Sequence, residues 1–310
     1  MVKRLLVVGS LNTDLAAQTS RLPKPGETVM AAGFRTGPGG KGANQAVAAA
    51  RLSSEVRVCM VGRVGDDPYG AALLANLSQS GVSVDWVGRD PEVGTGVALI
   101  TVDESGQNTI VVHPGANARL EARHVVEALQ NLDGVGALLI QLEIPLPTVE
   151  ATVREARRKG VPVILNPAPA QPLSPELLSA VDFLVPNESE AELLSGVPID
   201  GHPGRAERAA RSLIAQGASA VLITLGAQGA ILVDRERTAA FPAYAVKAVD
   251  ATAAGDAFLA GFAVRLLERG SVEEAVDWGC RAGALAASRP GAQQSLPMRQ
   301  EVERLGAEKR

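Results

Sequence analysis

Short apolar runs rich in Val, Ile and Leu recur along the chain, and stretches with helical spacing of apolar positions lie between them. The runs lack a polar alternate face, as expected of strands that are buried on both sides in a parallel sheet. Strands that alternate with helices predict right-handed βαβ units. The predicted strands are Leu5–Val8, Val56–Val61, Ala137–Ile140, Val161–Leu165, Phe183–Val185 and Ala220–Thr224, and the predicted helices are Gln45–Leu52, Pro68–Ser80, Thr148–Lys159, Arg205–Gln216, Asp256–Arg269, Ser271–Ser288 and Met298–Arg310.

Two segments interrupt this alternation. Residues Leu15–Phe34 and Gly94–His113 hold short β-like pieces around polar turns, and the second segment has the pattern of a hairpin. We expect them to form a small second sheet outside the main one, and a sheet over a ligand cleft is a lid. Because neither a low-complexity linker nor an internal repeat divides the sequence, we expect one α/β domain over residues 1–310.

Composition narrows the class of partner. The 310 residues carry a net charge of −4, with acidic and basic residues interspersed, which argues against a nucleic-acid surface. No run approaches the roughly 18 apolar residues of a membrane span, and the N-terminal apolar run is too short for a signal peptide. Cys59 and Cys280 stand far apart, outside any CxxC or metal-ligand spacing. We therefore expect a cytoplasmic protein with small-molecule partners, bound to neither nucleic acid nor membrane.

The strongest candidate for catalysis is the segment Ala248–Phe258, in which small residues lead into an apolar helix. The free amides and dipole of a helix N-terminus favour an anion. Asp256 could accept a proton from a substrate hydroxyl, while the amides of Ala253, Ala254 and Gly255 stabilise charge on a transferred phosphoryl group. Alternatively, Asp256 only caps the helix.

A second candidate is the glycine cluster at 37–45, which runs directly into a predicted helix. It is not a GxxxxGK[ST] phosphate loop, since Ser or Thr does not follow Lys41. A sugar site fits better, because glycines such as Gly40 and Gly42 let a polyol approach the backbone, and Lys41 and Asn44 offer groups that bind hydroxyls. A helix entry without any ligand remains the alternative.

Three further polar segments follow predicted strands. Asn12 and Asp14 come after the first strand, where ligands bind in open α/β sheets, although an ordinary Asx turn would look the same. Asn187 and Glu190 lie one helical turn apart and suit Mg²⁺ bound through water, or serve only as helix caps. The turn Thr224–Gly229 could cradle nucleotide phosphates with its amides, or be a simple connection between strands.

Read together, these segments resemble the PfkB family of carbohydrate kinases. Gly-Gly-Lys-Gly-Ala-Asn-Gln-Ala at 39–46 is similar to the N-terminal signature of the family, and Asp-Ala-Thr-Ala-Ala-Gly-Asp-Ala-Phe at 250–258 is similar to its C-terminal signature. The resemblance extends from Leu5 to about Pro297 and includes the stretches Pro25–Thr28, Thr95–Ala98, Gly115–Asn117, Gln141–Glu143, Leu165–Ala170 and Gly291–Gln293.

The resemblance implies a three-layer sandwich with a mostly parallel sheet, and transfer of phosphate from ATP with Mg²⁺ to the 5-hydroxyl of ribose. Because a lid sheet exposes strand edges and an apolar face, we expect two copies to pair through their lids as a homodimer. The resemblance also implies activation by K⁺. The residues it implies for the sugar are Asn12, Asp14, Gly40, Lys41, Gly42, Asn44, Glu143 and Asp256. Those for ATP are Asn187, Thr224, Leu225, Gly226, Ala227, Gln228, Gly229, Gly255 and Cys280, with Glu190 near Mg²⁺. Those for K⁺ are Asp250, Thr252, Ala286, Arg289, Gly291 and Ser295.

The chain departs from the family pattern in the C-terminal signature, where Ala251 and Ala253 stand in place of a threonine and a glycine. Other acceptors stay open, namely deoxyribose, fructose, a ketodeoxy sugar acid or a nucleoside. A non-catalytic sugar-binding module would be expected to have lost Asp256 or its glycine, and both are present. A Rossmann dehydrogenase is rejected, because the first strand leads into Gly9-Ser10-Leu11 rather than GxGxxG.

Overall fold

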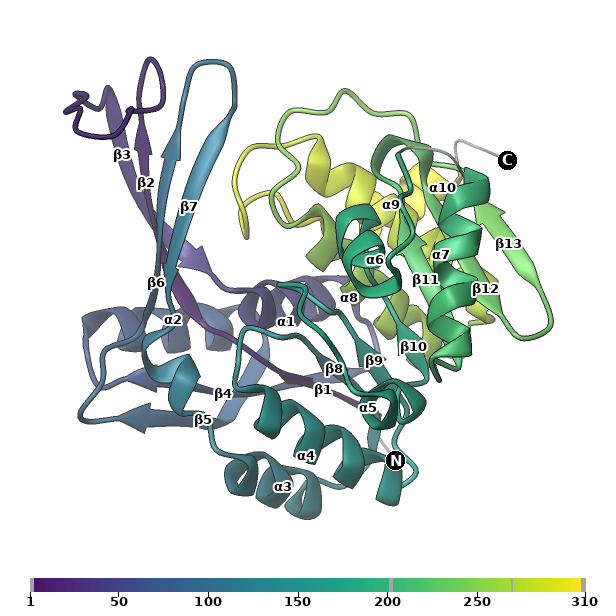
Figure 1. Cartoon of the computed structure of the whole chain (residues 1–310). Coiled ribbons are helices and arrows are strands. Elements are labelled where there is room, and N and C mark those ends of the chain that lie inside the picture. Colours follow the sequence, from purple (N-terminus) through teal and green to yellow (C-terminus); the bar gives the residue numbers. More distant parts are fainter. Residues whose placement is uncertain (1–2, 201–202, 269, 308–310) are drawn as a thin grey trace.

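A nine-stranded sheet, the main sheet, forms the centre of the protein (Figure 1). The computed structural model describes residues 3–200, 203–268 and 270–307. Neighbouring strands from β11 to β5 run parallel, and β12 and β13 extend the sheet by antiparallel pairing. The order across the sheet is β13 (Thr238–Phe241), β12 (Ala230–Asp234), β11 (Ala220–Thr224), β10 (Phe183–Leu184), β9 (Val163–Leu165), β8 (Val135–Ile140), β1 (Arg4–Val8), β4 (Arg57–Gly65) and β5 (Val82–Asp90).

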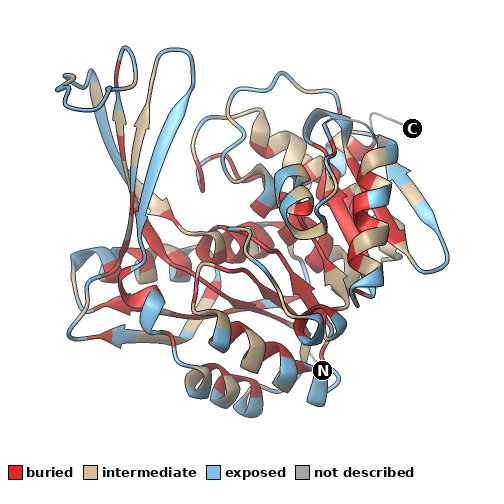
Figure 2. Ribbon diagram, viewed as in Figure 1, coloured by how far each residue is buried: buried red, intermediate tan, exposed pale blue. Residues whose placement is uncertain are grey.

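Helices cover both faces of the main sheet, because successive side chains of each strand point to opposite faces. Leu5 and Val7 of β1 belong to one apolar cluster, and Leu6 and Val8 belong to the other. Figure 2 shows the sheet buried between these layers. The first cluster packs against α1 (Lys41–Leu52), α2 (Pro68–Gln79), α8 (Ala254–Leu267), α9 (Val272–Ala287) and α10 (Arg299–Ala307). The second packs against α3 (Ala122–Asn131), α4 (Leu146–Arg158), α5 (Pro175–Ser179), α6 (Glu188–Ser195) and α7 (Pro203–Ala215). The predicted three-layer α/β sandwich is confirmed.

A second sheet of four strands, the small sheet, projects from one end of the main sheet (Figure 1). Its order is β3 (Gly33–Gly39), β2 (Asn12–Gln18), β6 (Gly96–Val102) and β7 (Asn108–His113). The hairpin of β6 and β7 agrees with the sequence pattern. The first predicted segment, residues 15–34, is too narrow, because β2 already begins at Asn12 and β3 continues to Gly39. These ends pair with each other, Asn12 opposite Gly39, so residues expected in loops belong to the sheet.

Most predicted elements are found with shifted ends. Helix α1 begins at Lys41 rather than Gln45, since Gly40 at its N-cap has a φ of 88° that only glycine adopts without strain. The strands β5 and β13 and the helices α3 and α5 were not predicted, whereas α6 and β12 follow the helix start at Asn187 and the turn at Thr224–Gly229 that the sequence indicated without bounds. Arg269 and residues 308–310, which the predicted helices included, lie outside the described residues. Within the described ranges, each helix is too short or too polar to cross a membrane.

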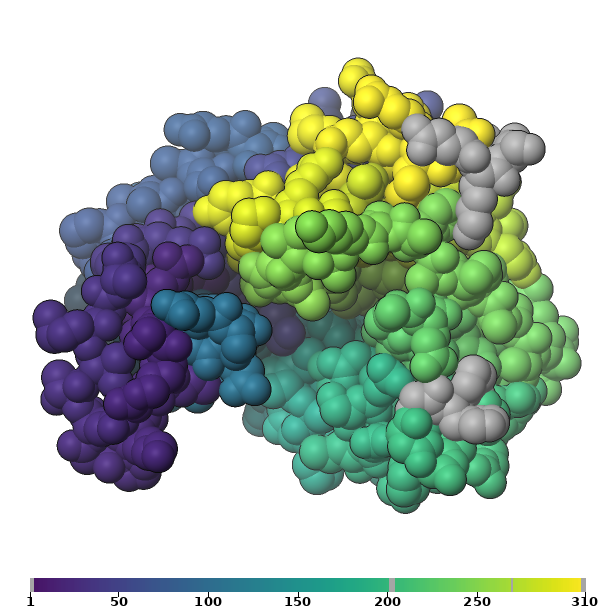
Figure 3. All heavy atoms as spheres, turned by 90° about the horizontal axis from the view of Figure 1, so that it is seen from above, coloured from purple at the N-terminus to yellow at the C-terminus, as the bar shows by residue number. Residues whose placement is uncertain are grey.

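The parallel topology brings distant polar residues to one edge of the main sheet. Gln141, Asn166 and Asn187 follow the carboxyl ends of β8, β9 and β10, and Thr224 ends β11. Helices α1 and α8 pack against each other, so that their N-terminal residues Lys41 and Asp256 face this edge. Seen from above, the purple strands of the small sheet and the yellow C-terminal segments border a hollow there (Figure 3).

Candidate active site

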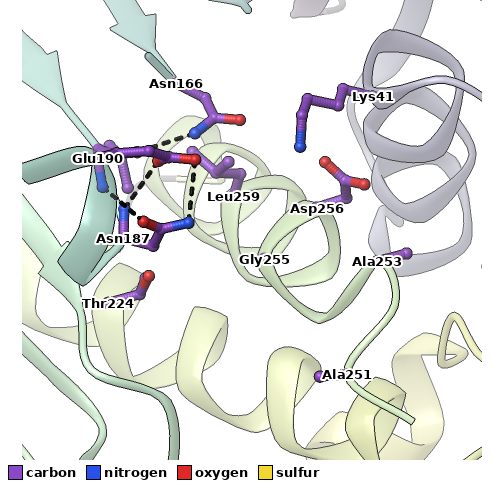
Figure 4. Close-up of a pocket in the computed structure, with 11 residues that line it drawn as sticks. Lys41, Asn166, Asn187, Glu190, Thr224, Ala251, Ala253, Gly255, Asp256 and Leu259 are labelled. Carbon is purple, nitrogen blue, oxygen red and sulfur yellow. Dashed lines mark hydrogen bonds between the residues drawn. The ribbon is translucent and has the colours of Figure 1, made fainter. Parts of the chain in front are cut away.

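A cavity of about 210 Å³ lies above this edge, between the beginnings of α1 and α8 and the ends of the strands. Figure 4 shows Lys41 and Asp256 facing each other on one side, with Asn187 and Glu190 on the other. Its lining residues are Lys41, Asn166, Val185, Asn187, Glu190, Thr224, Ala251, Ala253, Gly255, Asp256 and Leu259. The volume is below the roughly 300 Å³ or more of a typical ligand pocket, so it accommodates the reacting groups rather than two whole substrates.

Asp256 is the deepest charged group of the cavity, since it is only 7% exposed. Its Oδ1 accepts a hydrogen bond from Gln45 Nε2 at 2.9 Å, and its Oδ2 accepts one from Asn44 Nδ2 at 3.1 Å. Burial raises the pKa of Asp256, against the opposing effects of Lys41 and of these two amides. A buried carboxylate with two donors and a facing cation is suited to accept a proton from a bound hydroxyl.

Lys41 supplies that cation at the first position of α1. Burial opposes its charge, but the carboxylates of Asp256, Glu143 and Glu190 outweigh burial and raise the pKa of Lys41. Glu143 accepts hydrogen bonds from the Lys41 backbone amide, at 3.1 Å, and from Ser10 Oγ. Lys41 therefore stays protonated and can attract both the base and an incoming phosphate.

Asn12 and Asp14 lie on β2, the strand that continues from β1 into the small sheet. Asn12 is buried, and its Oδ1 accepts a hydrogen bond from Asn117 Nδ2 at 2.8 Å, which leaves the Asn12 amide hydrogens for another acceptor. Burial, together with the charges of Glu143 and Asp256, raises the pKa of Asp14 to about 6. Asn12 and Asp14 thus place a donor and an acceptor on the strand beside Glu143 and Asp256, and a polyol would need both.

The entry to α8 carries backbone strain. Ala253 is the N-cap residue and has a φ of 59°, in the left-handed region that alanine rarely adopts. Of the predicted anion-binding amides, that of Ala254 donates to the Ala251 carbonyl at 3.1 Å. Among the described residues, the amides of Ala253 and Gly255 have no backbone acceptor. Of the three amides predicted to bind an anion, those of Ala253 and Gly255 are therefore available, whereas that of Ala254 is already bonded.

Asn187 and Glu190 form the capping box of α6. Asn187 Oδ1 accepts from the Glu190 amide at 2.9 Å, and Glu190 Oε2 accepts from the Asn187 amide at 2.9 Å. Burial raises the pKa of Glu190, while the Asn187 amide and Lys41 lower it. Both side chains also line the cavity, so capping and ligand contact are compatible. Because capping occupies both carboxylate oxygens, this pair suits the water shell of Mg²⁺ better than the ion itself.

The turn Thr224–Gly229 offers the nucleotide fewer amides than the sequence suggested. The amides of Leu225, Gln228 and Gly229 donate to carbonyls within the turn, so they are not free to cradle phosphates. Gly226, Ala227 and Gln228 form a short 3₁₀ turn with exposed side chains. Thr224 is the member of this segment that lines the cavity, whereas Cys280 lies buried in the apolar cluster beneath α9 and is not among the lining residues.

Asp250 joins the two segments that the resemblance assigns to a monovalent cation. Its Oδ1 accepts from the Thr252 amide at 2.9 Å, and its Oδ2 accepts from the Gly291 amide at 2.8 Å. Burial opposes its charge, but these hydrogen bonds and the charge of Arg35 lower the pKa of Asp250. The remaining positions, Ala286, Arg289 and Ser295, lie at the end of α9 and in the loop after it.

An ionised carboxylate between two carbonyl-bearing segments fits a large cation with weakly held water. Within the described residues, three or more His, Cys, Asp or Glu side chains do not gather in a metal-binding group. A cation here would consequently depend on backbone carbonyls, which is the donor set that suits K⁺.

Several residues that organise the site were not assigned a role from the sequence. Ser10 connects Glu143 to the loop after β1. Asn117 holds both Asn12 and the backbone of Leu11, with Leu11 N to Asn117 Oδ1 at 2.9 Å. Gln45, Gln141 and Asn166 form a buried amide network around Asp256. A polar residue directly after an apolar strand was the available signal for Ser10, Gln141 and Asn166.

Comparisons with known proteins agree with this geometry. A model described as pfkB family carbohydrate kinase matches residues 2–299. A ribokinase from Haemophilus influenzae is 40% identical over 302 residues, covering 97% of this chain and 98% of that protein. A deoxyribokinase from Salmonella typhi is 38% identical over 294 residues, covering 94% and 95%. The structure of Arabidopsis thaliana ribokinase complexed with ribose and ATP matches with a TM-score of 0.89 at 34% identity, covering 98% of this chain and 99% of that one. With both signatures present and nearly the whole length matched, the chain belongs to the pfkB family of carbohydrate kinases and is a sugar kinase.

Proposed function

We propose that the protein transfers the γ-phosphoryl group of ATP to the 5-hydroxyl of ribose, giving ribose 5-phosphate and ADP. The observation that carries the proposal is the pair of buried Asp256 and half-buried Lys41 at the edge of the main sheet, with Asn12, Asp14 and Glu143 on the side assigned to the sugar. The likeness to a ribokinase complexed with ribose and ATP supports this acceptor and this donor.

In this proposal Asp256 accepts the proton of the 5-hydroxyl as its oxygen attacks the γ-phosphorus, and ADP leaves from the opposite side. Lys41 and the amides of Ala253 and Gly255 stabilise the negative charge on the transferred group. Mg²⁺, bound mainly by the ATP phosphates, would neutralise charge on them, and Glu190 would contact its water shell. Each of these groups lines the cavity described above.

The small sheet acts in the proposal as a lid that excludes water from the sugar side of a single catalytic domain. A cytoplasmic location agrees with the free cysteines Cys59 and Cys280.

Replacing Asp256 with Asn should lower kcat by a factor of ~10²–10⁴, because the variant lacks the general base. Ribose affinity should stay within a few fold, since the amide keeps the shape of the carboxylate. Steady-state kinetics and calorimetric titration with ribose measure the two quantities. A variant that retains more than about a tenth of the wild-type kcat would remove Asp256 from the mechanism.

The acceptor is tested with a panel of sugars in a coupled assay of ADP release. Ribose should be turned over faster than fructose and other hexoses, because each buried polar group left without a partner costs ~1–3 kcal/mol. Deoxyribose is the matched control, since it lacks only the 2-hydroxyl. Phosphate on any hydroxyl other than the primary one, or a higher kcat/KM for deoxyribose or fructose, would contradict ribose as the acceptor.

We propose that K⁺ raises kcat by ordering the segments joined by Asp250, and thereby the anion-binding amides next to them. With dialysed enzyme at constant ionic strength, balanced with tetramethylammonium, kcat should rise as K⁺ is added, while ribose affinity changes little. Asp250→Ala should weaken the response. A flat kcat over the titration would exclude the cation site and leave the sugar kinase assignment intact.

We also propose a homodimer formed through the small sheet. Five large apolar side chains, Phe34, Leu99, Ile110, Val111 and Val112, are 46% to 68% exposed on it, which is unusual for a monomer. Equilibrium sedimentation should give a dimer for the wild type and a monomer for Val111→Glu. Leu193 is an exposed apolar residue on α6, outside the small sheet, and offers a control. Leu193→Glu introduces the same charge as Val111→Glu but should leave the dimer intact. A wild-type monomer would contradict the proposal.

A further inference from the structure

A chain of buried amides connects the carboxyl end of β8 to the catalytic carboxylate. Gln141 Nε2 donates to Gln45 Oε1, and Gln45 Nε2 donates to Asp256 Oδ1 at 2.9 Å. Both glutamines are 0% exposed. Neither lines the cavity. Among the described residues, their shortest connection to the cavity is the bond from Gln45 to Asp256, and a longer one runs through Asn166, which also lines the cavity.

The hydrogen bonds of this chain all run in one direction. A primary amide has one oxygen that accepts and one nitrogen that donates. Since the Gln45 oxygen already accepts from Gln141, the Gln45 nitrogen must turn toward Asp256. Asn166 has the same influence, because its Nδ2 donates to the Val185 carbonyl at 3.1 Å, and its Oδ1 is a second acceptor for Gln45 Nε2 at 3.4 Å.

Packing holds Gln141 in place as the first member of this series of hydrogen-bonded amides. A Cβ atom at Gly9 would lie 1.9 Å from Gln141 Oε1, so the side chain fits only because residue 9 is glycine. That oxygen has no hydrogen-bond partner among the described residues. A buried carbonyl without a partner is unfavourable. The Gln141 nitrogen thus stays directed at Gln45, although this orientation leaves the Gln141 oxygen without a hydrogen bond among the described residues.

We propose that Gln45 and Gln141 are positioning residues, which fix the direction of the Asp256 carboxylate and keep a donor on its Oδ1, so that its Oδ2 side faces the substrate hydroxyl. The inference rests on the proposed role of Asp256 as the general base. It adds residues that touch neither substrate, and it predicts which property of the base they control.

The charges around Asp256 decide how a lost donor would act. Lys41 favours the ionised carboxylate, whereas Asp14, Glu143 and Glu190 disfavour it, as does burial, which raises the pKa of Asp256. Without the Gln45 donor, the ionised carboxylate would lose a stabilising hydrogen bond, which would raise the pKa of Asp256 further. Because the base acts only when ionised, the acidic limb of the pH profile should move to higher pH.

The test compares Gln45→Met and Gln141→Met, which keep the length of the side chain but remove its amide. For Gln45→Met the acidic limb of kcat/KM should shift upward by about one to two pH units, the equivalent of one hydrogen bond to a charged group. For Gln141→Met the shift should be smaller, about half a unit to one unit. In this variant the Gln45 amide is no longer held in one orientation, but it can still direct its nitrogen to Asp256 part of the time. The ribose dissociation constant should stay within about threefold in both, because neither glutamine lines the cavity.

Thr152→Val is the matched control. It removes a buried hydrogen bond from Thr152 Oγ1 to the Thr148 carbonyl inside α4, remote from the cavity, so it should lower the melting temperature without moving the pH profile. Glutamine variants that are also less stable but keep the wild-type profile and kcat would overturn the inference. If Gln45→Met does not fold, the profile of Gln141→Met decides. A substantial kcat in Asp256→Asn would contradict the role of Asp256 in the proposed function, whereas an unchanged pH profile in the glutamine variants would contradict only this inference. The two failures are therefore distinguishable.

Discussion

The burial of one carboxyl group, that of Asp256, is the constraint around which the site is arranged. Water normally stabilises the charge of such a group, and around Asp256 the protein replaces it with the amides of Asn44 and Gln45 and the cation of Lys41. All three replacements come from the first turns of α1. This helix must therefore begin at Lys41, pack against α8 and point its N-terminus into the cleft. The glycine at its N-cap and the alanine-rich face toward α8 follow from that requirement.

The same arrangement concentrates negative charge around a single cation. Asp14, Glu143, Glu190 and Asp256 all interact electrostatically with Lys41 or with one another. Lys41 faces four carboxyl groups, and burial, together with the charges of Glu143 and Asp256, raises the pKa of Asp14 to about 6. Asp14 belongs to β2 of the small sheet, and the proposed function assigns it to the sugar hydroxyls. In that proposal, hydroxyl groups that donate to these carboxylates would relieve the repulsion between them, which favours a ligand rich in donors.

The sequence predicted the fold well because buried parallel strands produce uninterrupted apolar runs, such as Ala137–Ile140. It predicted the chemistry where a residue type is rare in its context, as for Lys41 among glycines and Asp256 after Gly255. It could not predict partners that depend on register and packing. Gln45 and Gln141 are separated by 96 positions and meet only because β8 lies beside β1. Likewise, the amides of Leu225, Gln228 and Gly229 are already bonded within their turn, which composition does not reveal.

Ala253 shows that surrounding contacts determine the path of the backbone here. The family pattern has glycine where this chain has alanine, yet the residue keeps the left-handed conformation with a φ of 59°, at a cost of roughly 1–2 kcal/mol. The segment is fixed on both sides, by Asp250 bonded to Gly291 and by the first turn of α8, where the Ala257 amide donates to the Ala253 carbonyl. A backbone held at both ends cannot relax by rotating one residue. Ala253 therefore keeps its left-handed conformation at the edge of the cavity, and alanine in place of glycine is expected to affect stability more than the path of the backbone.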